Sequence, residues 1–204
     1  MKSFIANFEK AGLVNLRDLD PSIISDLKYA TTDNFTKERL YYCDFGLYLE
    51  PGLANAVASA SRTLQRIKPE ARLVVFDAAR PLSVQKKMYE VVRGTGMEKY
   101  VADPYGNFNG GFHNYGMAVD LSISVDGELL DMGTDFDSFL PAAHSGEELK
   151  MLEDGTISFE AYKNRMLLYF ITSSNGMLPH KYEWWHYQIE QNEQDKLKHT
   201  LLAF

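Results

Sequence analysis

The sequence predicts an α+β protein, and three patterns support this class. Residues 51–67 and 82–92 repeat apolar side chains every three or four positions, as amphipathic helices do. Residues 72–77 and 117–124 are the short apolar or alternating runs that are typical of strands. The turn after the second run favours an antiparallel hairpin. With 204 residues, 45% of them hydrophobic, the chain can bury a core. Its length favours one domain over residues 1–204, with two small domains as the alternative.

The composition argues against two classes of partner. The formal net charge is −7 and lysine and arginine do not cluster, which argues against binding to nucleic acid or to anionic membranes. No apolar run approaches the roughly 18 residues of a membrane span.

The single cysteine, Cys43, rules out an internal disulfide and fits either redox compartment. Because the first residues lack the apolar core of a signal peptide, we expect a cytoplasmic protein; a periplasmic one is the alternative if a signal peptide has been removed. The oligomeric state is not indicated.

The N-terminal segment, residues 1–50, is expected to be rich in loops. A turn signal lies at residues 19–22, and tyrosine and phenylalanine are dense over residues 29–48. Considered from the residues alone, Tyr29 is more consistent with a packed aromatic side chain than with a substrate contact.

Two helices and a strand are predicted next. The first helix covers residues 51–67 with Pro51 in its first turn, where proline is tolerated. The strand covers residues 72–77, and the second helix covers residues 82–92. The side chains predicted to be buried are Leu53, Val57, Ala60, Leu64 and Ile67 in the first helix and Val84, Met88 and Val91 in the second.

Arg80 lies between that strand and the second helix. Pro81 biases it toward extended backbone geometry, and an arginine at the end of a strand commonly projects into a cleft. The alternative is a surface arginine paired with Asp77.

A long connection and an alternating strand occupy the middle of the chain. Residues 93–116 are rich in glycine and asparagine, and connections of this length are often functional. The following strand places Asp120 on its polar face, and Asp126-Gly127 predicts a hairpin turn after it. The apolar face of the strand carries Met117, Val119, Leu121 and Ile123.

The last third of the chain predicts a helix, a strand and a short terminal helix. Ser158 is placed to cap a helix over residues 159–174, which Gly176 would end. Residues 182–190 are predicted to form a strand, and residues 196–204 a short helix. Considered alone, Asp137 is a loop carboxylate. The helix stripe predicted to be buried consists of Tyr162, Met166, Tyr169 and Phe170.

Four residues in two distant segments have the chemistry of a catalytic metal site. His113 lies in a glycine-rich turn, and Asp120 needs a partner because an unpaired buried carboxylate is costly. His186 supplies a second imidazole, and Glu183 supplies a carboxylate that need not bind the metal. Two nitrogens and one oxygen, with a fourth position open to water, fit catalytic zinc. Any one of these ligands, taken singly, is more often a satisfied structural residue.

One geometric requirement follows from this hypothesis. In an ideal strand, positions 183 and 186 face opposite sides, so Glu183 and His186 reach one water only if the strand begins after Glu183 or is bulged there. We predict such an irregularity. His144, His180 and His199 have no partner at ligand spacing and are interpreted as bystanders.

Taken together, these residues resemble the zinc D-alanyl-D-alanine peptidases. Glu183-Trp184-Trp185-His186 is closely similar to the D-alanyl-D-alanine dipeptidases of the VanX type. Further matches run in the same order, so that the resemblance spans residues 15–190. They are Lys28-Tyr29-Ala30-Thr31-Thr32-Asp33-Asn34-Phe35, Asp77-Ala78-Ala79-Arg80-Pro81 and Met132-Gly133-Thr134-Asp135-Phe136-Asp137.

The resemblance implies a small, mostly antiparallel central sheet flanked by helices, and zinc-dependent hydrolysis of D-alanyl-D-alanine to free amino acids. His113, Asp120 and His186 would hold the zinc. Glu183 would serve as general base and then acid, and Arg80 would stabilise the oxyanion.

The resemblance also implies how the substrate is held. Asp137 and Tyr29 match positions near the bound dipeptide, with Asp137 facing its free ammonium group. The family commonly has Ser-x-His where this chain has Gly111-Phe112-His113, so a hydroxyl contact is missing and the exact dipeptide stays open. The alternatives are a D,D-carboxypeptidase or another peptidoglycan peptidase on the same scaffold, and a non-catalytic zinc-binding module. The sequence does not distinguish a role in vancomycin resistance from one in D-alanine nutrition.

Overall fold

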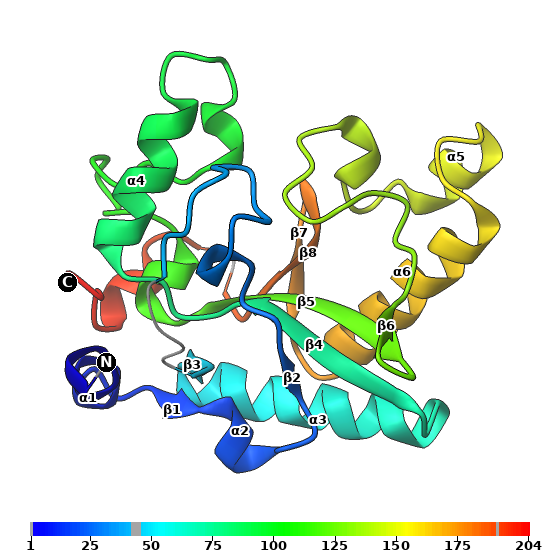
Figure 1. The fold of residues 1–204 in the computed structure, drawn as a ribbon, viewed down its shortest axis with the longest axis horizontal. Helices are drawn as coiled ribbons and strands as arrows, with labels where there is room; N and C mark the ends of the chain where they lie inside the picture. Colours follow the sequence, from blue (N-terminus) through cyan, green and yellow to red (C-terminus); the bar gives the residue numbers. More distant parts are fainter. Residues whose placement is uncertain (1, 42–45, 191) are drawn as a thin grey trace.

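The centre of the molecule is a six-stranded mixed sheet (Figure 1), seen here in a computed structural model that describes residues 2–41, 46–190 and 192–204. Cys43 lies outside the described residues. The strands are β1 (Val14–Asn15), β2 (Ile24–Ser25), β3 (Tyr48–Leu49), β4 (Ala71–Asp77), β5 (Ala118–Val125), β6 (Glu128–Leu129), β7 (Leu178–His180) and β8 (Glu183–Gln188). The helices are α1 (Lys2–Lys10), α2 (Leu16–Leu19), α3 (Pro51–Ile67), α4 (Leu82–Val92), α5 (Glu148–Glu153) and α6 (Phe159–Ser173).

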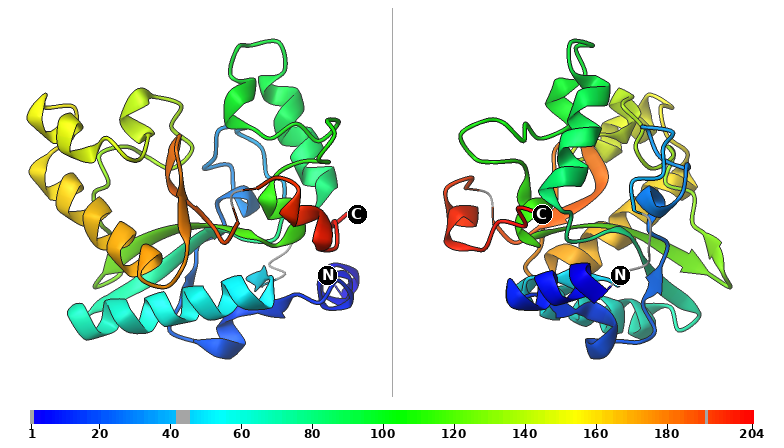
Figure 2. Two further views of the ribbon diagram at one scale, coloured as in Figure 1. Left: turned by 180° about the vertical axis from the view of Figure 1, so that it is seen from behind. Right: turned by 60° about the vertical axis from the view of Figure 1, so that its left-hand side comes forward.

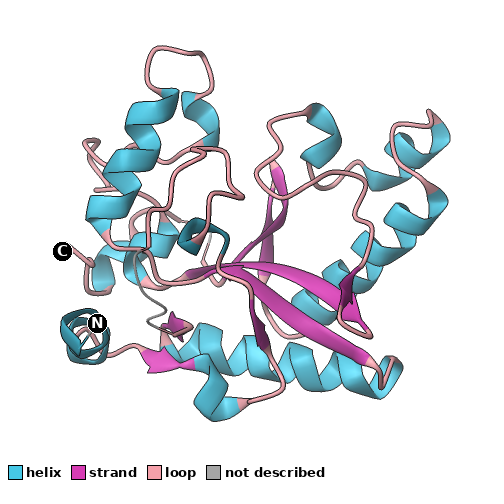
Figure 3. Ribbon diagram, in the orientation of Figure 1, coloured by secondary structure: helices cyan, strands magenta, loops and turns pink. Residues whose placement is uncertain are grey.

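The strand order confirms the predicted class, an α+β fold with a mostly antiparallel sheet. The order is β2-β4-β5-β8-β7, with β6 paired to β5, and only the β2–β4 pair is parallel. β1 and β3 form a separate two-stranded sheet. Figure 3 shows the magenta strands at the centre with cyan helices around them.

The two faces of the sheet have different environments. α3 contacts both β4 and α6, so these two helices cover one face, beneath and to the right of the sheet in Figure 1. The odd-numbered residues of β5 pack there: Leu121 and Ile123 are fully buried in one core with Leu53 and Leu168. The even-numbered side chains of β5, among them Asp120, therefore face the opposite side, which loops cover.

The two ends of the chain lie side by side (Figure 2). The ring of Phe204 lies 5.8 Å from that of Phe4 and 5.5 Å from that of Phe8. In addition, the backbone N–H of Leu82 donates to the carbonyl of Leu202, which fixes the C-terminal segment at the start of α4.

Most of the predicted elements are confirmed. α3 and α4 have the predicted bounds, β4 begins one residue before its predicted start, and the hairpin turn holds Asp126 and Gly127 at positive φ, as a type I′ turn requires. The predicted helix stripes are buried except at their last positions, because Ile67 and Val91 are about half exposed.

The buried face of α6 was predicted wrongly. Ser158 caps this helix as expected, accepting a hydrogen bond from the N–H of Ala161. However, Arg165 is buried and its guanidinium donates to three backbone carbonyls, so the helix turns a face with a charged residue inward. The stripe predicted to be buried, Tyr162, Met166, Tyr169 and Phe170, is partly or largely exposed, whereas Ala161, Leu168 and Ile171 are buried.

The C-terminal prediction was also partly wrong. Only residues Asp195–Lys198 form a helical turn, and residues 199–204 are irregular. By contrast, the predicted irregularity near Glu183 is present: Pro179 pairs with Tyr187, but the next residue of β7, His180, pairs with Glu183. Within the described part of the chain, we find no helix that is both long and apolar enough to traverse a membrane.

Candidate active site

Three side chains from two distant segments converge on the polar face of the sheet. His113 lies in a short helical turn, Phe112–Tyr115, immediately before β5, while Asp120 and His186 are directly paired across β5 and β8. The His113 Nε2 atom lies 3.3 Å from Asp120 Oδ1 and 3.2 Å from His186 Nδ1, and His186 Nδ1 lies 3.2 Å from Asp120 Oδ1. His113 and Asp120 are buried, and the side chain of His186 is 12% exposed.

The hydrogen bonds of the two histidines show which nitrogen atoms face the centre of this triad. His113 Nδ1 lies 2.7 Å from the carbonyl of Ala78, so this nitrogen carries the proton and Nε2 presents a lone pair. His186 Nε2 lies 3.2 Å from Gln188 Oε1, which in the same way leaves a lone pair on Nδ1.

The triad is therefore a set of acceptors without a donor. Asp120 Oδ1 is buried and has no hydrogen-bond partner among the described residues. Burial raises the pKa of Asp120, and the two adjacent histidines lower it only when they are protonated and donate to the carboxylate. With their lone pairs turned inward, a charged Asp120 needs a cation as its partner. Two lone pairs and a carboxylate oxygen that meet in this way fit a divalent cation.

Glu183 lies beside the triad because of the irregularity in β8. Its Oε2 atom is 3.5 Å from His186 Nδ1, and its side chain is 16% exposed. Burial raises the pKa of the Glu183 carboxyl well above its usual value, and the negative charges of Asp120 and Asp137 raise it further. A carboxyl group with a raised pKa next to a metal site has the chemistry of a general base.

Arg80 lines the site cavity, as the first interpretation of this residue expected. It does pair with Asp77, but it is buried and not a surface arginine. Its Nε and Nη2 atoms lie 2.8 and 2.7 Å from Asp77 Oδ2, and Nη1 donates to Gln85 Oε1 at 2.8 Å. These contacts use three of the five guanidinium N–H groups. The nearest carboxylate of the triad, Asp120 Oδ2, is 3.8 Å from Nη2.

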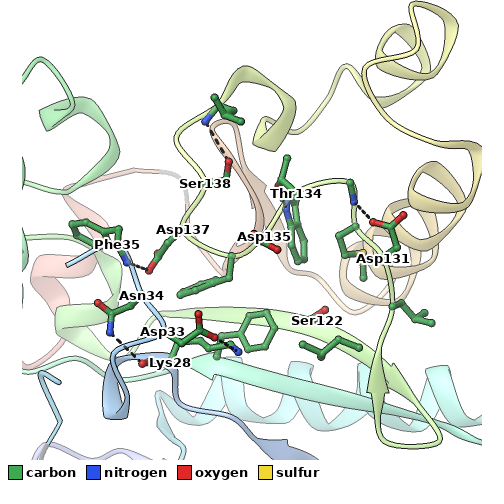
Figure 4. Close-up of a pocket in the computed structure, with 18 of the residues that line it drawn as sticks. Lys28, Asp33, Asn34, Phe35, Ser122, Asp131, Thr134, Asp135, Asp137 and Ser138 are labelled. Carbon is green, nitrogen blue, oxygen red and sulfur yellow. Dashed lines mark hydrogen bonds and ion pairs between the residues drawn. The ribbon is translucent and has the colours of Figure 1, made fainter. Parts of the chain in front are cut away.

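Asp137 and Tyr29 lie together on another wall of the site. The Tyr29 hydroxyl donates to Asp137 Oδ1 at 2.8 Å, and the backbone N–H of Phe35 donates to Oδ2 at 3.1 Å. Burial raises the pKa of Asp137 to about 7, although these hydrogen bonds act in the opposite direction. Figure 4 shows Asp137 beside Phe35, at the edge of a neighbouring cavity of about 880 Å³ that both residues also line.

All the predicted site residues line one cavity of about 340 Å³. Glu193, Phe139, Tyr100 and Trp185 also contribute to its wall. A Cβ atom at Gly111, which lines it too, would lie 3.0 Å from the Ala102 side chain, so the wall leaves little room for the serine expected there. The predicted residues that line the cavity are Tyr29, Arg80, His113, Asp120, Asp137, Glu183 and His186.

Three further residues contribute to the site and were not assigned to it from the sequence. Gln188 follows His186 by two positions on the same strand face, a spacing that could have identified it. Asp77 was considered only as the partner of a surface arginine, yet both residues are buried. His180 was interpreted as a bystander but lines the cavity, and no sequence spacing reveals this because it depends on the register of β7 and β8.

The fold and the triad together define a site suited to metal-assisted hydrolysis, and comparisons with known proteins agree. A family model described as peptidase M15, D-ala-D-ala dipeptidase, matches residues 9–203. The chain belongs to this peptidase family.

Three relatives carry the name D-alanyl-D-alanine dipeptidase. The protein of Escherichia coli K12 is 28% identical over 183 residues, which cover 88% of this chain and 85% of that protein. The one from Synechocystis is 30% identical over 68% of each chain. The protein of Enterococcus faecalis is 28% identical over 87% of this chain and 91% of its own length.

Proposed function

We propose that this peptidase hydrolyses D-alanyl-D-alanine to two D-alanine molecules, with a zinc ion held by His113, Asp120 and His186. The observation that carries the proposal is the convergence of two imidazole lone pairs on the unpartnered oxygen of Asp120. Two nitrogens, one oxygen and no cysteine form a ligand set that zinc uses in catalytic sites. When bound, zinc lowers the pKa of a coordinated water from about 15.7 to about 7, which supplies a nucleophile near neutral pH.

In this mechanism Glu183 moves the proton. It accepts a proton from the attacking water and delivers it to the amine that leaves. Its raised pKa supports this role, because a stronger base captures the proton more readily.

Arg80 donates to the peptide carbonyl oxygen as negative charge develops there. Asp77 and Gln85 hold the guanidinium in place, so it is oriented before the substrate arrives. A lost donor of this kind costs roughly 3 kcal/mol of transition-state stabilisation.

Asp137 and Tyr29 bind the free ammonium group of the dipeptide. A carboxylate in a small, largely enclosed cavity favours a substrate with a cation at that position and disfavours an acylated amine, which carries no charge. This preference supports a dipeptidase over a D,D-carboxypeptidase.

The test is a metal assay of the purified protein combined with a substrate panel. We expect one zinc per chain, hydrolysis of D-Ala-D-Ala, and little hydrolysis of L-Ala-L-Ala or of N-acetyl-D-Ala-D-Ala. Faster cleavage of the N-acetylated substrate would instead support a carboxypeptidase, and zinc binding without any hydrolysis would support a non-catalytic module.

A further inference from the structure

His180 lies closer to the catalytic machinery than its position in the sequence suggests. It is the last residue of β7 and pairs with Glu183, whereas a regular register would have placed it opposite His186. The irregularity that brings Glu183 to the triad therefore also brings His180 to Glu183. The His180 Nδ1 atom lies 3.5 Å from Glu183 Oε2.

The Nδ1 atom of His180 is buried and has no hydrogen-bond partner among the residues that the structure describes. Such groups are uncommon in folded proteins, because a buried polar atom without a partner loses its hydrogen bonds to water. The carboxyl group of Glu183 is the acceptor within reach of this atom. Hydrogen bonds among catalytic groups are often long before substrate binds and shorten in the working complex.

Among the described residues, the Glu183 carboxyl group has few other polar contacts. Its Oε2 atom is also 3.5 Å from His186 Nδ1, but that nitrogen presents a lone pair and cannot donate. The backbone carbonyl of Glu183 accepts from the Ser145 hydroxyl, a contact that restrains the main chain but not the carboxyl group. A donor at His180 would supply the missing restraint.

We propose that His180 is a positioning residue, which donates its Nδ1–H to the Glu183 carboxylate and holds it in the orientation needed to take a proton from water. The inference rests on the proposed function of Glu183. A neutral imidazole suits the task, because a lysine or arginine here would add a positive charge and weaken Glu183 as a base. The His180 ring is itself fixed, with its centroid 5.1 Å from that of His186 and 5.7 Å from that of Tyr182.

The test compares two substitutions that differ in one property. His180→Phe keeps a ring but removes the donor, whereas His180→Asn keeps an N–H near the position of Nδ1. For D-Ala-D-Ala we expect His180→Phe to lower kcat by about 10- to 100-fold, a fraction of the roughly 10²–10⁴ that a general base contributes. KM and the zinc content should stay unchanged, and His180→Asn should retain most of kcat.

His144→Phe is the matched control. The His144 ring lies 5.2 Å from the same Tyr182, but His144 does not line the cavity, so this variant should keep its activity. Equal losses of kcat in His180→Phe and His180→Asn would show that the ring acts through packing and would overturn the proposal. An unchanged kcat in His180→Phe would overturn it as well.

A second readout does not depend on turnover. In crystal structures of the zinc-loaded proteins, the Glu183 carboxylate should lie within hydrogen-bond distance of residue 180 in the wild type and in His180→Asn, and should rotate away or adopt several orientations in His180→Phe. If the wild type is inert toward dipeptides, the proposed function fails, and these structures still decide the role of His180. The same Glu183 orientation in all three proteins would refute it.

Discussion

Asp77 offers a sharp test of how the site is held together. It is fully buried and binds the Arg80 guanidinium at 2.7 and 2.8 Å, while Asp120 lies 3.8 Å from the same group. Asp77→Asn keeps the shape of the side chain but removes its charge. Arg80 should then move toward Asp120, the carboxylate that remains within reach, and compete with zinc for it.

The size of this effect follows from the distances. Shortening the Arg80–Asp120 separation from 3.8 Å to about 2.8 Å strengthens the attraction by roughly 1.5 kcal/mol at an effective dielectric constant of about 20. Zinc must displace this interaction to bind, so its affinity should fall about tenfold. This value lies at the lower end of the roughly 10- to 100-fold losses seen when groups that support metal ligands are changed.

The assay is competition for zinc against a chromophoric chelator at neutral pH. Asp33→Asn is the control, because it removes the same charge from an exposed carboxylate that pairs with Lys28. Adding Arg80→Met to Asp77→Asn should restore zinc affinity, since the competing cation is gone. If the double variant binds zinc as weakly as Asp77→Asn, then Asp77 does not act through Arg80 and the reasoning is wrong.

Three further predictions test the site and the fold. Glu183→Ala should keep its zinc and lose about 10²- to 10⁴-fold in kcat, whereas His186→Ala should lose the metal; metal analysis beside kinetics checks both. Because the pKa of Asp137 is raised to about 7, its charge is lost as pH falls through that value, so KM for the dipeptide should rise toward acid pH. The positive charge of a bound divalent cation would lower this pKa, and Asp137→Asn should remove this pH dependence of KM. Leu168→Ala should lower the free energy of unfolding by about 2–5 kcal/mol in urea titrations, because Leu168 is a buried side chain of α6. Tyr169→Ala should lower it by less than about 1 kcal/mol, because Tyr169 is half exposed. Similar losses in the two variants would contradict the observed buried face of α6.

The elements predicted correctly are those whose signals are local. α3 and α4 carry regular apolar repeats with proline at or just before their first turn, and the Asp126-Gly127 turn requires positive φ at both positions. The short strand β2 could not be predicted in this way, because two residues form a strand there only by pairing with β4.

The face of α6 failed for a different reason. The predicted stripe did not include Arg165, and a buried charge is costly unless it is paired. In the structure the carbonyls of Met132, Ala142 and His144 accept its hydrogen bonds. Those carbonyls belong to the connection that carries Asp137, far from Arg165 in sequence. A pattern within one helix carries no information about acceptors that another segment supplies.

The candidate site could be predicted from the sequence, because metal-ligand chemistry restricts the residue types to a few, such as those with imidazole and carboxylate groups. The groups that orient those residues could not be predicted. Asp77 holds the Arg80 guanidinium, and Gln188 accepts a hydrogen bond from His186. Both contacts depend on the bends and the register of the sheet, which pair Asp77 and His186 with the same residue of β5, Asp120.

The irregularity in β8 connects Glu183, the triad and the wall that carries Asp137. Pairing of His186 with Asp120 fixes two residues of the triad along one edge of β8, and the shift that places Glu183 opposite His180 fixes Glu183 along the other edge. Trp184 and Trp185, which lie between Glu183 and His186, are buried and contact the segment before Asp137. The Trp184 indole N–H donates to Thr134 Oγ1 at 2.9 Å. The Trp185 ring lies 5.2 Å from the ring of Phe136. A regular strand would turn one of these side chains toward the triad. The two tryptophans therefore hold the distorted strand and the Asp137 segment together, so that Glu183 and Asp137 are positioned by the same contacts.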